Sequence, residues 1–261
     1  MPNFTPTIAG VPLPFCLMNA AGALSTSKEE LMALARSESG AVVTKSITTA
    51  PFEDPGARCG LENPGYAWYV KWMPEILRTG KPVIASVAGF SVEEYIEVAQ
   101  ALAAAGASLI EINLNDPHVH THLNPFRSAG FLGETVVAIR QAVQAPLAVK
   151  LPPYVPLPLN DVAAALLEAA IPAAICHNAS SNGVPSQAQT ILHASSGKLA
   201  VIGVGSVSST PEALAALHSG IKAIQIGSAV VKEGVDVFAR LKQEMTVGIA
   251  SLHAELTASQ P

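Results

Sequence analysis

The sequence predicts a closed (β/α)8 barrel, and three observations support this fold class. The chain has 261 residues, close to the roughly 250 typical of such barrels. Hydrophobic residues make up 49% and aromatic residues only 5%, which is typical of parallel strands buried on both faces under alanine-rich helices. Short apolar segments alternate with helical segments along the chain, as consecutive right-handed βα units require. No linker or low-complexity run divides it, so we expect residues 1–261 to form a single domain.

The expected elements follow the chain in order. Residues 5–15 turn at Ala9-Gly10 and predict a small hairpin that caps the bottom of the barrel. Ser25 or Ser27, and later Ser91, precede acidic residues as helix N-caps do. A helix is expected over 66–78, and a C-terminal helix from about 229 to about 252. The eight strands are expected at residues 15–19, 41–46, 82–87, 108–114, 147–151, 173–178, 199–204 and 223–226.

Composition limits the function classes. The net charge is −5, so we expect no nucleic-acid partner and no binding to anionic lipid. The N-terminal segment lacks the basic region of a signal peptide, and no apolar run has the length of a membrane span. Three cysteines without a CxxC pair indicate no disulfide framework. These features favour a cytoplasmic protein that acts on a small molecule.

A phosphate-binding site is predicted where the last two strands end. The strand over 199–204 runs into a turn with Gly203, Gly205 and Ser206, and the strand over 223–226 ends at Gly227-Ser228. Glycine turns expose backbone N–H groups beside a helix N-terminus, where an anion is stabilised. In a (β/α)8 barrel these last two loops are the usual phosphate site.

Polar residues also follow the predicted strands at Asn19, Lys45, Asn113, Lys150 and Asn178. Each residue alone is explained equally well as a cap or a solvated charge. Together they end five different strands at the face where barrel enzymes carry their chemistry. Two lysines and three amides facing a phosphate site suit a ligand with a phosphate tail and a polar head, and flavin mononucleotide (FMN) fits this description.

Six further segments stand out along nearly the whole chain: FCLMNAAG (15–22), TKS (44–46), EINL (111–114), VKLPPY (149–154), IGVGSV (202–207) and QIGSA (225–229). In this order they resemble the dihydroorotate dehydrogenase family, and its soluble class 1 most closely. The resemblance implies an FMN enzyme that oxidises dihydroorotate to orotate in pyrimidine biosynthesis, passing a hydride to flavin N5 while a loop base removes a proton. Class 1 relatives are usually dimers, so a homodimer is expected, and the electron acceptor stays open.

The resemblance assigns roles residue by residue. Catalytic roles fall on Asp116, Lys45 and His118. Substrate contacts fall on Lys45, Gly60, Leu61, Asn113, Asn178 and Ala179. Cofactor contacts fall on Ala20, Ala21, Gly22, Lys45, Ser46, Asn113, Lys150, Asn178, Gly203, Gly205, Ser206, Gly227 and Ser228.

The substrate half departs from the family pattern. Asp116 stands where the family has a cysteine or serine base, and His118 stands where it has a substrate-binding asparagine. A second family asparagine aligns with Ala57, and the family's Asn-Ser is Asn178-Ala179 here. A carboxylate is a weak base at neutral pH, but burial under a loop would raise its pKa. The alternative is that Asp116, in an Asn-Asp-Pro sequence, only forms a turn.

Other readings stay open. His118, His120 and His122 would point one way in an extended segment and bind a metal, although we expect no metal. Cys59 and Cys176 are expected to be small buried residues, with Cys59 within reach of substrate. The chain would otherwise be a relative acting on a different small substrate, or a flavin-binding protein without turnover. A cofactor-free isomerase, or an aldolase with Lys45 or Lys150 as Schiff-base lysine, is the remaining class.

Overall fold

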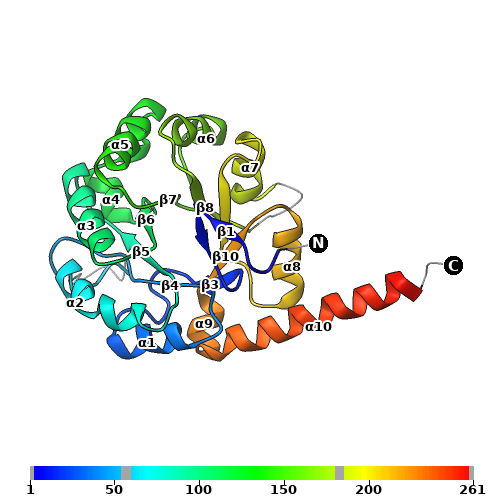
Figure 1. The fold of residues 1–261 in the computed structure, drawn as a ribbon. Coiled ribbons are helices and arrows are strands. Elements are labelled where there is room, and N and C mark those ends of the chain that lie inside the picture. Colours follow the sequence, from blue (N-terminus) through cyan, green and yellow to red (C-terminus); the bar gives the residue numbers. More distant parts are fainter. Residues whose placement is uncertain (1–2, 54–59, 180–184, 259–261) are drawn as a thin grey trace.

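The computed structural model describes residues 3–53, 60–179 and 185–258, with side chains to residue 247. Eight parallel strands form one sheet that curves into a barrel (Figure 1). Their order is β3-β10-β9-β8-β7-β6-β5-β4, which confirms the predicted fold class. The strands are β3 (Leu17–Asn19), β4 (Val42–Val43), β5 (Val83–Val87), β6 (Leu109–Asn113), β7 (Leu147–Lys150), β8 (Ala173–His177), β9 (Ala200–Val204) and β10 (Ala223–Ile226).

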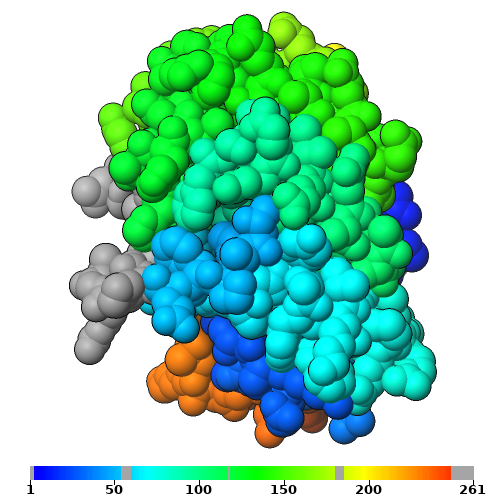
Figure 2. Space-filling model, turned by 90° about the vertical axis from the view of Figure 1, so that its left-hand side faces the viewer, coloured from blue at the N-terminus to red at the C-terminus, as the bar shows by residue number. Residues whose placement is uncertain are grey.

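Helices surround the barrel (Figure 1), and the outer helices α2 and α3 form a continuous surface over the face shown in Figure 2. None of the helices in the described ranges is long and apolar enough to cross a membrane. The helices are α1 (Lys28–Arg36), α2 (Tyr66–Leu77), α3 (Val92–Ala104), α4 (Pro117–His122), the 3-10 turn η1 (Pro125–Arg127), α5 (Ala129–Ala142), α6 (Leu159–Glu168), α7 (Gln187–Ala194), α8 (Thr210–His218), α9 (Ser228–Glu233) and α10 (Asp236–Ala258).

Two sequence-based boundaries were wrong. The second strand is limited to Val42–Val43. The chain after it stays beside β5, where the Ile47 amide donates to the Ser86 carbonyl. On its other side β3 has already ended at Asn19, so the Lys45 amide donates to the Ser25 carbonyl of a loop and not to a strand. The predicted C-terminal helix is two helices, α9 and α10. Gly234 ends α9 with a φ of 75°, a conformation that glycine adopts without steric cost.

The predicted helix caps are present. Ser27 and Glu30 form a capping box at the start of α1, and the Ser91 hydroxyl accepts a hydrogen bond from the Glu94 amide at 3.3 Å. The Glu94 carboxylate accepts from the Phe90 amide at 2.6 Å. Each cap satisfies backbone N–H groups that a helix terminus would otherwise leave unpaired.

The N-terminal hairpin, β1 (Thr7–Ile8) with β2 (Val11–Pro12), confirms the prediction. Ile8 and Leu13 are buried and pack with inward-facing strand residues such as Met18, Ile84 and Leu109. The hairpin therefore closes the end of the barrel where the strands begin, and leaves the opposite end to polar groups.

The barrel closes at a seam between β3 and β4, which are the two ends of the sheet order but contact each other. The Asn19 side chain joins them: its Nδ2 donates to the Val43 carbonyl at 2.7 Å, and its Oδ1 accepts from the Val43 amide at 2.9 Å. The Gly40 amide adds a bond to the Leu17 carbonyl at 2.7 Å. Asn19 therefore pairs backbone at the seam, which corrects the expectation that it faces a ligand.

Replacing Asn19 is predicted to destabilise the fold strongly. Asn19→Ala leaves a buried N–H and a buried C=O of Val43 without partners, and each such group costs about 1–3 kcal/mol. We expect the free energy of unfolding to fall by about 2–5 kcal/mol in urea denaturation. The exposed Asn160→Ala is the matched control, with an expected change below about 0.5 kcal/mol. A loss for Asn19→Ala no larger than for the control would contradict this role.

Candidate functional site

A buried polar layer crosses the barrel above its apolar interior. The Glu111 carboxylate on β6 lies at its centre: Oε1 accepts from Ser86 Oγ at 2.9 Å and from Lys150 Nζ at 3.3 Å. Oε2 accepts from Gln225 Nε2 at 2.6 Å, and Lys150 Nζ also lies 3.4 Å from Gln225 Oε1. These four side chains, from β5, β6, β7 and β10, are buried. The layer therefore contains a buried ion pair at the strand ends, between the Lys150 ammonium and the Glu111 carboxylate.

A second chain of hydrogen bonds fixes Asn113 at the end of β6. Its Nδ2 donates to Ser46 Oγ at 2.7 Å, and Ser46 Oγ lies 3.1 Å from Ser86 Oγ. Its Oδ1 accepts from the Asn115 amide at 2.9 Å, and its carbonyl accepts from the Tyr95 hydroxyl at 2.7 Å. The structure therefore brings Ser46 and Asn113 together with the Glu111 layer.

Lys45 lies in the same region, and its side chain is largely buried. Its Nζ donates to the carbonyl of Gly60. Gly22, with a φ of 90°, lies so close that an added Cβ would sit 3.4 Å from Lys45 Nζ. Gly22, Lys45 and Gly60 are thus grouped as predicted. Leu61 differs, because its side chain is fully buried in the hydrophobic core.

The Ala20-Ala21-Gly22 segment follows β3 and lies beside the end of β10. The Ala20 amide donates to the Ile226 carbonyl at 2.9 Å, and a Cβ added at Gly227 would sit 3.6 Å from the Ala20 Cβ. Helix α9 starts at Ser228, and its first backbone bond runs from the Val231 amide to the Gly227 carbonyl. The amides of residues 228–230 precede that bond and have no acceptor within the helix.

The predicted phosphate turn follows β9. Gly205 and Ser206 have positive φ values of 81° and 56°, whereas Gly203 lies inside β9 against Asn178. A cavity of about 310 Å³ between α7 and α8 extends to this turn, and its lining residues are Asn178, Ala179, Gln189, Ser206, Glu212, Ala215, Ala216 and Ser219. The amides of residues 208 and 209 are held by the Glu212 carboxylate at 2.7 and 3.0 Å. These two amides are therefore already paired, and the Gly205 amide donates to the Gln225 carbonyl at 3.4 Å.

Asp116 caps the short helix α4. Its Oδ1 accepts from the His118 amide at 2.9 Å, as an N-cap does, and the carboxylate is nearly buried, with 6% of the residue exposed. Burial raises the pKa of the Asp116 carboxyl, against the opposing effects of the His118 amide and the charges of His118, Lys45 and His120. Asp116 thus caps a turn, and its carboxylate is also close enough to Lys45 for the lysine charge to lower its pKa.

The three histidines after Asp116 do not form an extended segment, because the sequence from Pro117 to His122 is helical. His120 Nε2 lies 2.8 Å from the Leu114 carbonyl, and His122 Nδ1 lies 2.8 Å from the His118 carbonyl. The His118 ring packs edge-on against Phe52, with ring centroids 5.3 Å apart. Among the described residues no group of three His, Cys, Asp or Glu side chains could hold a metal ion.

The cysteines carry no visible chemistry in the described ranges. Cys176 is fully buried, and burial raises the pKa of its thiol. Burial raises the pKa of the Cys16 thiol to about 12. Cys59 and Ala57, which were aligned with the substrate loop, lie outside the described residues.

Sequence reasoning missed Ser86, Glu111, His177 and Gln225, which also face the barrel interior. The alternation of inward-facing and outward-facing residues along each strand would have indicated them. Glu111 precedes Asn113 by two residues on β6, and His177 follows the inward-facing Ala173 and Ile175 of β8 by the same spacing. Residues two apart on a strand share a face.

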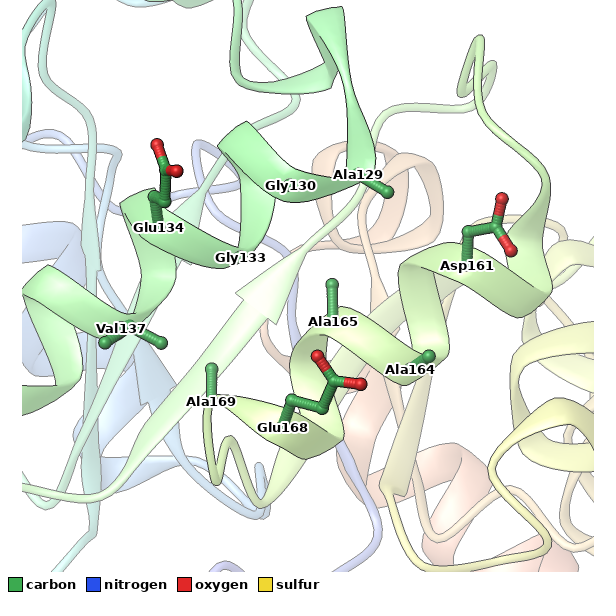
Figure 3. Close-up of a pocket in the computed structure, with 10 residues that line it drawn as sticks. All are labelled: Ala129, Gly130, Gly133, Glu134, Val137, Asp161, Ala164, Ala165, Glu168 and Ala169. Atoms are coloured by element: carbon green, nitrogen blue, oxygen red, sulfur yellow. The ribbon is translucent and has the colours of Figure 1, made fainter.

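A separate groove of about 410 Å³ lies on the outer ring between α5 and α6 (Figure 3). Alanine and glycine line it, together with Glu134, Asp161 and Glu168. None of the predicted site residues borders this groove. The groove is therefore distinct from the polar layer at the strand ends.

The fold and the polar layer define a (β/α)8 barrel enzyme with its site at the carboxyl ends of the strands. The family model described as dihydroorotate dehydrogenase matches residues 4–197 and 186–248. The chain belongs to the dihydroorotate dehydrogenase family and is therefore an oxidoreductase. This assignment favours the redox reading over the aldolase or isomerase alternatives.

Individual relatives agree with the family assignment. A putative dihydroorotate dehydrogenase A (fumarate) of Streptococcus agalactiae is 30% identical over 281 residues, covering 91% of each chain. The dihydroorotate dehydrogenase (fumarate) of Trypanosoma cruzi is 28% identical over 275 residues, covering 87% of each chain. A ligand-free dihydroorotate dehydrogenase structure from Eimeria tenella has a TM-score of 0.78 at 15% identity and covers 94% of this chain and 87% of its own. That structure supports the fold.

Removing the buried carboxylate is predicted to be costly. Glu111→Gln leaves the Lys150 charge buried without its counter-charge, and breaking a buried ion pair this way costs about 3–5 kcal/mol. We expect a loss of that size in the free energy of unfolding, measured by denaturant titration. The exposed Glu97→Gln is the control. The double variant Glu111→Gln/Lys150→Met should recover part of the loss, and a double variant as unstable as Glu111→Gln would contradict charge burial as the cause.

Proposed function

We propose that this protein is an FMN-dependent dihydroorotate dehydrogenase that oxidises dihydroorotate to orotate in pyrimidine biosynthesis. The observation that carries the proposal is Lys150, held by Glu111 at the ends of the strands, between the Gly22–Lys45 side of the barrel and the Gly205–Ser206 turn. The family membership supplies the reaction class.

The residues present fit FMN. A buried lysine, the backbone approach allowed at Gly22 and Gly227, and the amides at the start of α9 supply a positive charge, close packing and anion donors. We propose that Ser206, Gly205, Gly227 and Ser228 hold the phosphate, and that Lys150, Asn113, Ser46 and Lys45 hold the ring. When bound, FMN supplies a two-electron acceptor for a hydride.

The buried layer would give this site a fixed electrostatic character. Glu111 and Gln225 hold the Lys150 ammonium by direct contacts, so its charge needs little reorganisation when a ligand binds. Asn113 is fixed by bonds from both its carboxamide atoms. These residues would orient the ligand without moving.

Asp116 is the proposed base. Its nearly buried carboxylate has a raised pKa, which brings a carboxylate nearer to the range useful for accepting a proton from carbon. The Lys45 charge acts on it from the same side of the barrel. His118 is proposed to contact substrate from α4, where Phe52 fixes its ring.

The cofactor and substrate can be tested together. The purified protein, or the protein incubated with FMN, should show flavin absorption near the visible maxima of bound FMN. Anaerobic addition of dihydroorotate should then bleach it, with fumarate tested as the reoxidant because the relatives carry that word in their names. A protein that binds no FMN contradicts the cofactor assignment, and one that binds FMN without bleaching contradicts the substrate.

Asp116→Asn separates the base from the helix cap. Asparagine caps helices about as well as aspartate, and it removes a charge whose folded pKa is raised. Because the carboxyl pKa is higher in the folded state, the free energy of unfolding decreases as pH rises above the unfolded pKa near 3.9. The variant should therefore be no less stable at neutral pH, while Asp116→Ala should lose about 1 kcal/mol.

Flavin reduction is the second readout for Asp116. We expect Asp116→Asn to slow anaerobic stopped-flow reduction by about 10²–10⁴-fold. In the wild type, kcat/KM should fall with decreasing pH as the carboxylate becomes protonated, and Asp116→Asn should lack this limb. Asp161→Asn, at an exposed position in α6, is the control. Equal reduction rates in Asp116→Asn and the wild type would exclude Asp116 as the base.

A second candidate is a related FMN enzyme that acts on a different small ring. The altered substrate half favours it, since Asp116 and His118 replace the residues expected from the family pattern and His118 packs against the aromatic Phe52. Anaerobic flavin bleaching by another pyrimidine or enoyl-type compound, with none by dihydroorotate, would select this candidate.

Assembly and location belong to the same proposal. We propose a cytoplasmic homodimer. Sedimentation velocity of the purified protein checks the dimer, and a single species at the mass of one 26.9 kDa chain would contradict it.

A further inference from the structure

One buried nitrogen at the strand ends has no hydrogen-bond partner among the described residues. His177 is the last residue of β8, and its Nε2 is shielded from solvent without a hydrogen bond to any described group. A buried ring nitrogen left unpaired is destabilising. Such an atom at the functional face of a barrel indicates a partner other than the described residues.

The strand register points this histidine inward. Ala173 and Ile175 of β8 belong to the inner cluster of the barrel, whereas Ala174 and Cys176 belong to the outer core. His177 continues the inward series. It pairs in register with Val204, the last residue of β9, so its ring lies at the mouth of the barrel.

The neighbours of His177 are the two ends of the proposed cofactor site. On the β7 side, the Lys150 charge acts on the ring; burial and this charge lower the imidazole pKa, which keeps the ring neutral at neutral pH. On the β9 side, a Cβ added at Gly205 would sit 3.9 Å from Nδ1. His177 therefore lies between the lysine and the glycine turn.

The backbone of His177 is braced from the outside. Its amide donates to Gln187 Oε1 at 2.9 Å, and Gln187 Nε2 donates to the Pro152 carbonyl at 2.8 Å. One glutamine thus ties the end of β8 to the loop after β7. These bonds hold the backbone from which the His177 ring extends.

We propose that His177 is a cofactor-binding residue whose Nε2 forms a hydrogen bond with bound FMN, between the parts of FMN held by Lys150 and by the Gly205 turn. This inference rests on the proposed FMN cofactor and adds a contact that the family resemblance did not assign. A neutral imidazole offers one donor and one acceptor nitrogen. Nε2 therefore suits the hydroxyl and carbonyl groups of a flavin nucleotide.

The test compares FMN affinity among isosteres. His177→Leu removes both nitrogens, His177→Asn can replace only Nδ1, and His177→Gln places an amide near Nε2. We expect the FMN dissociation constant, measured by flavin fluorescence quenching, to rise about 3–10-fold in the Leu and Asn variants, which is the effect of losing one neutral hydrogen bond. The Gln variant should stay within about twofold of the wild type. His193→Leu, at an exposed position of α7, should bind FMN unchanged.

Thermal unfolding gives a readout independent of activity. Without added FMN, His177→Leu should be at least as stable as the wild type, because it removes an unpaired buried nitrogen. With saturating FMN, its increase in Tm should be smaller than that of the wild type. Equal FMN affinity in the wild type and His177→Leu, or a Gln variant as weak as the Leu variant, would overturn the assignment. A wild type that binds no FMN would instead overturn the proposed function.

Discussion

The contact between Lys150 and Glu111 is the constraint on which the upper half of the barrel depends. An ammonium group at the centre of a barrel is costly unless a carboxylate and further hydrogen bonds compensate it. Here Glu111 and Gln225 accept from the Lys150 ammonium, and Ser86 donates to the Glu111 carboxylate. The pair comes from neighbouring strands, β6 and β7, so strand register alone brings the charges together. A chain of hydrogen bonds runs from this compensated charge through Ser86 and Ser46 to Asn113.

Much of the fold could be predicted from residue patterns because local and global signals agree. The eight strands, the hairpin at Ala9-Gly10 and the cap at Ser27 all follow from apolar runs, glycine turns and capping residues. The boundaries that failed depend on tertiary contacts. The strand β4 is short because β3 ends at Asn19, so the Lys45 amide bonds to the Ser25 carbonyl of a loop, which no propensity in 41–46 indicates.

The candidate site was predictable only in part. Lys45, Asn113 and Lys150 were found because strand ends carry function in this fold, and the structure groups them with Ser46 and Gly22. Glu111 and Gln225 were visible in the quoted segments but their meaning required the register, since a buried carboxylate is interpretable only beside its cation. Asn19 was expected to face a ligand because it is a polar residue at a strand end, but its side chain pairs with the Val43 backbone. Asp116 combines both cases, because its capping and its electrostatic environment come from the same carboxylate.

The seam at Asn19 has a geometric consequence for the whole cylinder. A closed barrel requires a definite stagger between its first and last strands, and that stagger sets strand tilt and radius. Here the stagger between β3 and β4 is held by the Asn19 carboxamide, which bonds to both backbone groups of Val43, together with the bond from the Gly40 amide to the Leu17 carbonyl. The segment Ala20–Gly22 follows this residue directly. The stagger of the barrel and the position of the loop after β3 therefore depend on the same side chain.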